Sequence, residues 1–91
     1  MVKKILKFSA TWCGPCKSYH NTFENVSKLE KYKDIEFKEL DAEENEDEFL
    51  KYKIRAVPTT ILLDENDNAI SATSGNIPQE MLINFIDSNN A

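Results

Sequence analysis

The feature that most constrains this 91-residue chain is a Cys-x-x-Cys pair placed between an apolar run and a stretch of helical periodicity. Cys13 and Cys16 are the only cysteines, and the apolar run before them covers residues 5–10. Beyond them, large apolar side chains recur at the spacing of one buried helical face, at Tyr19, Phe23, Val26 and Leu29. The pattern predicts a strand over residues 2–9 and a helix over about 14–32. A cysteine pair at such a junction indicates redox chemistry before it indicates a structural clip.

The start of the expected helix suits that chemistry. Pro15 falls in the first turn, where its missing N–H costs nothing because those N–H groups have no partner within the helix. Helical Cα atoms three residues apart are about 5 Å apart, inside the disulfide range of about 4.4–6.8 Å. Free amides and the helix dipole favour a thiolate on Cys13. We therefore predict that Cys13 is the attacking sulfur and Cys16 the resolving thiol.

Residues 12–17, Trp-Cys-Gly-Pro-Cys-Lys, resemble the thioredoxin active site, and Phe8 and Ala10 just before them strengthen the likeness. A second similar stretch lies downstream at residues 54–60, Ile-Arg-Ala-Val-Pro-Thr-Thr, followed by Gly75. Either motif alone is suggestive, whereas both together in this order are specific. The resemblance spans nearly the whole chain.

The rest of the pattern agrees with this family. We expect further strands over residues 35–40, 59–64 and 69–73, a second helix ending near Tyr52 and a last helix with Pro78 at its first position. The expected core faces of those two helices are Phe49, Leu50 and Tyr52, and Met81, Leu82, Phe85 and Ile86.

The resemblance implies one domain over residues 1–91 with an α/β thioredoxin fold. The element order β-α-β-α-β-β-α corresponds to a three-layer α/β/α arrangement with a four-stranded mixed sheet. The first residues align with the central strand of the family. We therefore expect the fold without the extra N-terminal strand and helix of full-length thioredoxins.

The resemblance also assigns roles around Pro58. It implies a cis bond between Val57 and Pro58, with Pro58 facing Cys13 and Cys16. In the family, the backbone before this proline holds the substrate in an extended, strand-like pairing, which assigns that task to Val57. Gly75 then keeps the neighbouring loop low enough for the substrate to approach the site. Without the family, Pro58 also fits an ordinary proline that opens a strand, since only about one X–Pro bond in twenty is cis.

The residues around the nucleophile are expected to contact the substrate. Trp12 is the only tryptophan, and we expect a partly exposed ring that shields the sulfur and shapes the docking surface. Gly14 and Pro15 lie between the cysteines and belong to the same surface. The alternative for Trp12 is plain core packing.

The chain departs from the family beneath the site. Thioredoxins place a buried acid six residues before the first cysteine and a lysine on the next strand, and this chain has Lys7 and Glu39 there. We expect a charge-swapped, partly buried ion pair below Cys16. Lys7 would favour the Cys16 thiolate, and Glu39 could serve as the base. The alternative is that Lys7 reaches solvent and pairs with nothing.

His20, the only histidine, follows Cys16 by four residues. We expect it at the surface. It could also assist exchange, whereas a metal site is disfavoured, because two thiols and one histidine do not complete a tetrahedral zinc cage.

Composition limits the partners. The net charge of −5 argues against nucleic acid and against an anionic membrane surface. No run is long enough to span a bilayer, and Lys7 interrupts what would otherwise begin like a signal peptide. A lone redox pair fits the cytoplasm, and we expect a monomer. The acidic run over residues 41–48 is either a solvated face or a docking surface.

Together these observations predict a protein disulfide reductase, an electron carrier in cell redox homeostasis that cycles between a Cys13/Cys16 dithiol and disulfide. No cofactor is expected on the chain. The family's usual donor is thioredoxin reductase with NADPH, and the acceptors are disulfide-containing proteins. The alternatives are a non-catalytic thioredoxin-like binding subunit and a partner-specific oxidase or isomerase.

Overall fold

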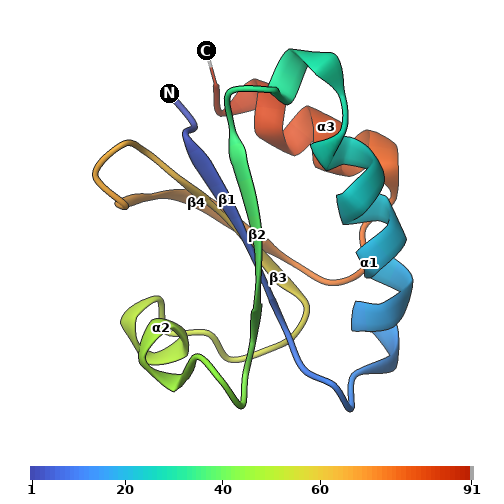
Figure 1. The fold of residues 1–91 in the computed structure, drawn as a ribbon, viewed down its shortest axis with the longest axis vertical. Helices are drawn as coiled ribbons and strands as arrows, with labels where there is room; N and C mark the ends of the chain where they lie inside the picture. The colour runs from blue at the N-terminus through green and yellow to red at the C-terminus, as the bar shows by residue number, and fades with distance from the viewer. Residues whose placement is uncertain (91) are drawn as a thin grey trace.

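The computed structural model describes residues 1–90, and its elements follow the predicted order (Figure 1). The strands are β1 (Lys4–Ser9), β2 (Glu36–Asp41), β3 (Thr59–Leu63) and β4 (Ala69–Ser74). The helices are α1 (Gly14–Ser27), α2 (Glu46–Lys51) and α3 (Gln79–Ser88), with a 3-10 turn, η1, at Glu30–Tyr32. No helix within this part of the chain is both long and apolar enough to cross a bilayer.

The four strands form one mixed sheet in the order β2-β1-β3-β4. Strand β1 pairs in parallel with β2 and antiparallel with β3, and β3 continues antiparallel to β4. Helices α1 and α3 cover one face of the sheet and α2 the other (Figure 1). The three-layer arrangement expected from the sequence is confirmed, with β1 at its centre.

The central position of β1 follows from its side chains, because five of its six residues are buried. Ile5 joins the core under α1 and α3, whereas Leu6 and Phe8 join the core under α2. A strand buried on both faces needs apolar side chains on both. Lys7 breaks that pattern, and its surroundings are described with the site.

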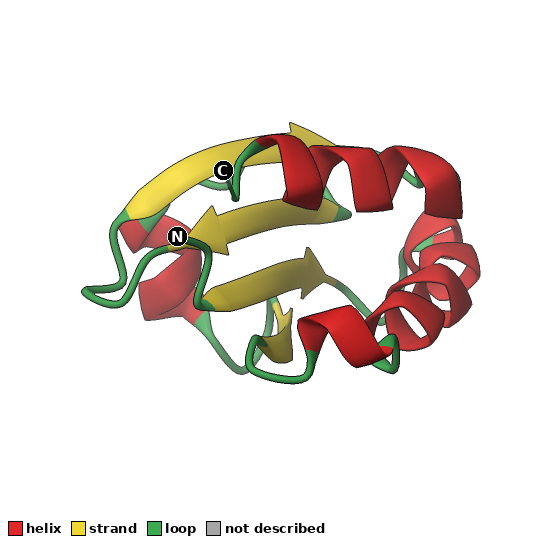
Figure 2. Cartoon of the chain, turned by 90° about the horizontal axis from the view of Figure 1, so that it is seen from above, coloured by secondary structure: helices red, strands yellow, loops and turns green. Residues whose placement is uncertain are grey.

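The N-terminal segment and the end of the described chain, at Asn90, lie side by side at one end of the molecule (Figures 1 and 2). The Val2 N–H donates a hydrogen bond of 2.9 Å to Oδ1 of Asn90. The motif at the start of α1 lies at the opposite end (Figure 1).

The first helix is shorter than predicted. It ends at Ser27, and Leu29 adopts extended dihedral angles of −69° and 134° before η1 begins. Tyr32, at the expected end of that helix, is a buried core residue whose hydroxyl donates to Oδ1 of Asp87 at 2.7 Å. No glycine or proline marks this break in the sequence, so periodicity alone extended the helix through it.

The prediction that Leu50 and Met81 belong to the core is wrong. Leu50 is 76% exposed and Met81 is 56% exposed. Helix α2 has only six residues, so a single face meets the sheet. Phe49 and Tyr52 fill that face, with ring centroids 4.9 and 6.0 Å from that of Phe8.

Element ends also differ by one residue from several predictions. Strand β2 begins at Glu36 and ends at Asp41, and β3 ends at Leu63. Pro78 is the N-cap of α3, with extended angles of −62° and 156°, and not its first helical residue. Such shifts arise because hydrogen bonding to neighbours, rather than residue type, decides where an element ends.

Candidate active site

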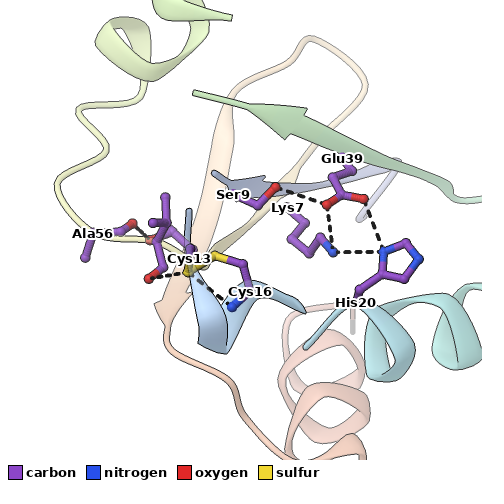
Figure 3. The surroundings of a disulfide bond; sticks show 9 residues. Lys7, Ser9, Cys13, Cys16, His20, Glu39 and Ala56 are labelled. Carbon is purple, nitrogen blue, oxygen red and sulfur yellow. Dashed lines mark hydrogen bonds and ion pairs between the residues drawn. A yellow bond between two sulfur atoms is a disulfide. The ribbon is translucent and has the colours of Figure 1, made fainter. Parts of the chain in front are cut away.

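The two cysteines form a disulfide at the start of α1 (Figure 3). Cys13 is the N-cap, and its Sγ accepts a hydrogen bond of 3.1 Å from the N–H of Cys16. Pro15 lies in the first turn, and the two cysteine Cα atoms are 5.3 Å apart, as the helical spacing predicted. Both cysteines are buried, so each sulfur presents only a small surface.

The loop before β3 lies against Cys13. The Val57–Pro58 bond is cis, as the resemblance implied. The carbonyl oxygen of Val57 lies 3.7 Å from Sγ of Cys13, a position from which it can accept a hydrogen bond once the disulfide opens to thiols. The backbone expected to pair with a substrate therefore lies directly beside the reacting sulfur.

Two hydrogen bonds hold this loop. The N–H of Gly75 donates to the carbonyl oxygen of Pro58 at 2.8 Å, and the hydroxyl of Thr59 donates to that of Ala56 at 2.6 Å. Gly75 has a φ of +96°, a conformation that side chains other than glycine's rarely adopt. Gly75 thus anchors the β4 end against the cis-proline loop.

An apolar groove runs beside the nucleophile. Trp12 is 72% exposed, which excludes plain core packing. This shallow hollow of about 230 Å³, which we call the apolar groove, is lined by Trp12, Ala42, Phe49, Ile54, Arg55, Ala56 and Val57. Gly14 and Pro15 are exposed at the helix start. The groove adjoins Cys13 through Val57, whose carbonyl oxygen lies beside Sγ.

A polar cluster, defined as Lys7, Ser9, His20 and Glu39, lies on another side of the disulfide (Figure 3). Lys7 has no exposed surface, and its Nζ lies 3.1 Å from Oε2 of Glu39, which is 42% exposed. In the parallel pairing of β1 with β2, these two residues are register partners. The predicted partly buried ion pair is confirmed, and the alternative of a solvent-reaching Lys7 is wrong.

The buried ammonium of Lys7 also lies over two aromatic rings. Its Nζ is 5.9 Å from the ring centroid of Tyr19 and 5.4 Å from that of Phe23. Ring faces attract cations at such distances. Together with Glu39, these rings compensate a charge that would be costly if left alone in the interior.

Glu39 is held as a carboxylate. Burial raises the pKa of the Glu39 carboxyl, but the hydrogen bond and charge of Lys7, the hydroxyl of Ser9 and the neighbouring His20 outweigh it, and the pKa lies below its ordinary value. The Ser9 hydroxyl donates to Oε2 at 3.0 Å. A carboxylate with these donors is a weaker base than a free one.

His20 is exposed, as expected, but its ring belongs to the cluster. Its Nδ1 lies 3.3 Å from Oε1 of Glu39 and 3.5 Å from Nζ of Lys7, and its Nε2 lies 3.5 Å from Oε2 of Glu24. Sequence reasoning expected His20 at the surface and left a role in exchange open, but it did not link His20 to Lys7 and Glu39. The four-residue steps from Cys16 to His20 and from His20 to Glu24 were the signal that could have linked them.

A hollow of about 340 Å³ joins this cluster to the resolving cysteine. Its lining includes Cys16, Ser9, His20 and Glu39. Ser9, His20 and Glu39 therefore share with Cys16 one space large enough for several water molecules. Over the described residues, no group of three or more histidine, cysteine, aspartate or glutamate side chains is arranged to hold a metal ion.

Comparison with known proteins agrees with the geometry. The family model described as Thioredoxin matches residues 2–88. The chain is 38% identical over 77 residues to Thioredoxin-1 of Caenorhabditis elegans, covering 85% of this chain and 64% of that protein. It is 38% identical over 72 residues to Thioredoxin H5 of Oryza sativa subsp. japonica, covering 79% and 52%. The chain thus spans about half to two thirds of the length of these relatives.

Solved structures show the same fold. The thioredoxin of Malassezia sympodialis superposes with a TM-score of 0.83 at 28% identity, covering 94% of this chain and 74% of that one. The germline-specific thioredoxin Deadhead of Drosophila melanogaster gives a TM-score of 0.83 at 29% identity, covering 93% and 78%. With the disulfide, the cis-proline loop and the matched residues in agreement, this chain belongs to the thioredoxin family.

Proposed function

We propose that this chain is a thiol-disulfide oxidoreductase that acts as a protein disulfide reductase. The observation that carries the proposal is the Cys13–Cys16 disulfide at the N-terminus of α1, with the backbone of Val57 beside it. A helix N-terminus stabilises a thiolate through its free N–H groups and its dipole. The N–H of Cys16 already points at Sγ of Cys13.

The reaction starts from the dithiol. The Cys13 thiolate attacks one sulfur of a substrate disulfide, forms a mixed disulfide and releases the other substrate sulfur as a thiolate. Cys16 then loses its proton and attacks Sγ of Cys13. The Cys13–Cys16 bond forms, the bond to the substrate breaks, and two electrons have passed to the substrate.

Docking of the substrate uses the surface around Cys13. An extended substrate segment would pair with the backbone of Val57, which cis-Pro58 and Gly75 hold in place, while its side chains occupy the apolar groove. Trp12, Gly14 and Pro15 border the nucleophile. Recognition through backbone atoms suits a reductase with many protein substrates, because backbone pairing does not read sequence.

The charges beneath the site serve the second sulfur. Lys7 favours the Cys16 thiolate through its positive charge. Glu39 compensates Lys7 and lines the hollow beside Cys16, where it takes part in accepting the thiol proton. Both roles depend on the ion pair being next to the hollow and not in open solvent.

The return to the dithiol requires an external donor. We propose thioredoxin reductase with NADPH, so that the chain itself binds no cofactor, and disulfide-containing proteins as acceptors. A negative net charge of −5 and an exposed apolar groove suit protein partners rather than nucleic acid or an anionic membrane. We further propose a cytoplasmic, monomeric carrier.

An insulin-reduction assay with dithiothreitol as donor tests the proposal. The wild type should accelerate insulin precipitation, and Cys13→Ser should lose that acceleration, by about 10³-fold or more. Cys16→Ser should accumulate a covalent mixed disulfide with insulin, visible by mass spectrometry and removed by excess thiol. A wild type with both thiols intact and no acceleration would identify a binding subunit instead. A second assay with NADPH and thioredoxin reductase tests the donor.

A further inference from the structure

We propose that His20 is the final acceptor of the proton that Cys16 loses when it resolves the mixed disulfide; this inference rests on the reductase function proposed above. Cys16 and His20 are four residues apart on α1 and therefore project from one face of the helix. Both line the same hollow of about 340 Å³. A proton can cross such a space through water.

The carboxylate of Glu39 is a poor resting place for that proton. Its Oε2 already accepts from Lys7 at 3.1 Å and from Ser9 at 3.0 Å. Its Oε1 instead faces Nδ1 of His20 at 3.3 Å. A carboxylate at this distance favours the protonated form of the imidazole, because the two charges are opposite. The proton therefore moves past Glu39 and rests on the ring.

The charges in the polar cluster stabilise the state in which His20 has taken the proton from Cys16. The imidazolium lies between Glu39 at Nδ1 and Glu24 at Nε2, the latter at 3.5 Å. The Cys16 thiolate forms on the side of the buried, positively charged Lys7. The new positive charge on the ring therefore has a carboxylate near each nitrogen.

The ring changes partners as it takes the proton. Nδ1 lies 3.5 Å from Nζ of Lys7, so a neutral ring with a free Nδ1 accepts from Lys7, whereas a protonated Nδ1 donates to Glu39. The remaining charged groups that line the hollow are Lys17, Asp41 and Glu44.

The Cys16 thiol gives its proton to Nδ1 of neutral His20, and the resulting thiolate attacks Sγ of Cys13. The Cys13–Cys16 bond forms and the Cys13–substrate bond breaks. The substrate sulfur leaves as a thiolate and takes a proton from water, and the imidazolium returns its proton to solvent.

Stopped-flow fluorescence of Trp12, the only tryptophan and next to Cys13, can follow the two chemical phases separately. We expect His20→Gln and His20→Ala to leave the first phase, attack by Cys13, unchanged. The second phase should slow by about tenfold to a hundredfold at pH 7. It should converge with the wild type near pH 10, because the thiol then ionises without a base. Added imidazole should restore the second phase in His20→Ala.

Asn21→Ala, at an exposed position on the same helix, serves as the matched control and should change neither phase. A second phase that His20→Gln leaves at the wild-type rate across the pH range would overturn the inference while leaving the reductase function intact. A slowed phase that imidazole does not restore in His20→Ala would reduce His20 to a structural residue. Absence of both phases in the wild type would instead contradict the proposed function.

Discussion

The disulfide separates two regions of opposite character. On one side lies the apolar groove, which is open to solvent and ends at the backbone of Val57. On the other lies the polar cluster, which places a fully buried lysine against a half-exposed glutamate. The groove acts through shape and backbone atoms, and the cluster acts through charge. Under the proposed function, this difference means that the two sulfurs are controlled separately: Cys13 by the surface that receives the substrate, and Cys16 by the interior groups that accept its proton.

The largest effect is expected on the free energy of unfolding when the ion pair is broken. The loss should differ between the variant that removes Glu39 and the variant that removes Lys7. Glu39→Gln leaves the ammonium of Lys7 buried with only aromatic rings and His20 near it, and should lower the free energy of unfolding by about 3 kcal/mol. Lys7→Met leaves a carboxylate that water can reach and should change it by less than about 1 kcal/mol. Urea unfolding of the three proteins at pH 7 measures both.

The double variant Lys7→Met/Glu39→Gln serves as the control. Its stability should return to that of Lys7→Met, because the buried charge is gone. Equal losses from the two single variants would mean that Lys7 is more hydrated than its burial indicates, and the contrast between interior and surface would fail.

The next effect belongs to the apolar groove. Trp12→Ala removes an exposed ring that borders the nucleophile and should raise the KM for insulin by about tenfold, equivalent to about 1.4 kcal/mol of lost binding. The pH dependence of insulin reduction should keep its shape, because the substitution leaves the polar cluster unchanged. A changed pH profile with an unchanged KM would place Trp12 in control of Cys16 and so erase the division between the two regions.

A smaller effect concerns acid stability. The pKa of Glu39 in the folded chain lies below its ordinary value of 4.5 because the donors around it outweigh its burial. The folded state therefore binds fewer protons, and the stabilisation is present above that ordinary value and is lost as the pH falls through the folded pKa. The stability gap between the wild type and Glu39→Gln should narrow as the pH is lowered below 4.5. Urea midpoints measured between neutral and acid pH test this, and a gap independent of pH would contradict it.

The smallest effect is expected at Leu50, which lies on α2 but outside the apolar groove and is 76% exposed. Leu50→Gln should change the free energy of unfolding by less than about 0.5 kcal/mol and leave the KM for insulin unchanged. A raised KM would extend the substrate surface along α2 and enlarge the groove side of the comparison.

The parts of the site that local sequence dictates were predictable. The helix start, the N-cap position of Cys13 and the place of Pro15 depend on residues within one turn. The cis-proline loop came from a motif shared with the family. Pairing of Lys7 with Glu39 was also anticipated, but only because the family supplied the register of the two strands.

Other features were missed because they depend on packing. The end of α1 and the burial of Tyr32 follow from the hydroxyl contact with Asp87 in α3, far along the chain. Exposure of Leu50 and Met81 follows from how much of each short helix meets the sheet. The membership of His20 in the polar cluster required β1, β2 and α1 to be placed together.

By itself, the sequence determined the order of the elements and the place of the cysteine pair at the start of a helix, because each rests on contacts between near neighbours or on a recognisable motif. Only the tertiary structure decided that Lys7 is fully buried, that Glu39 and His20 face it, and that Glu39 and His20 line the same hollow as Cys16. Burial and charge pairing are properties of residues brought together from three elements, and no single stretch of chain contains them.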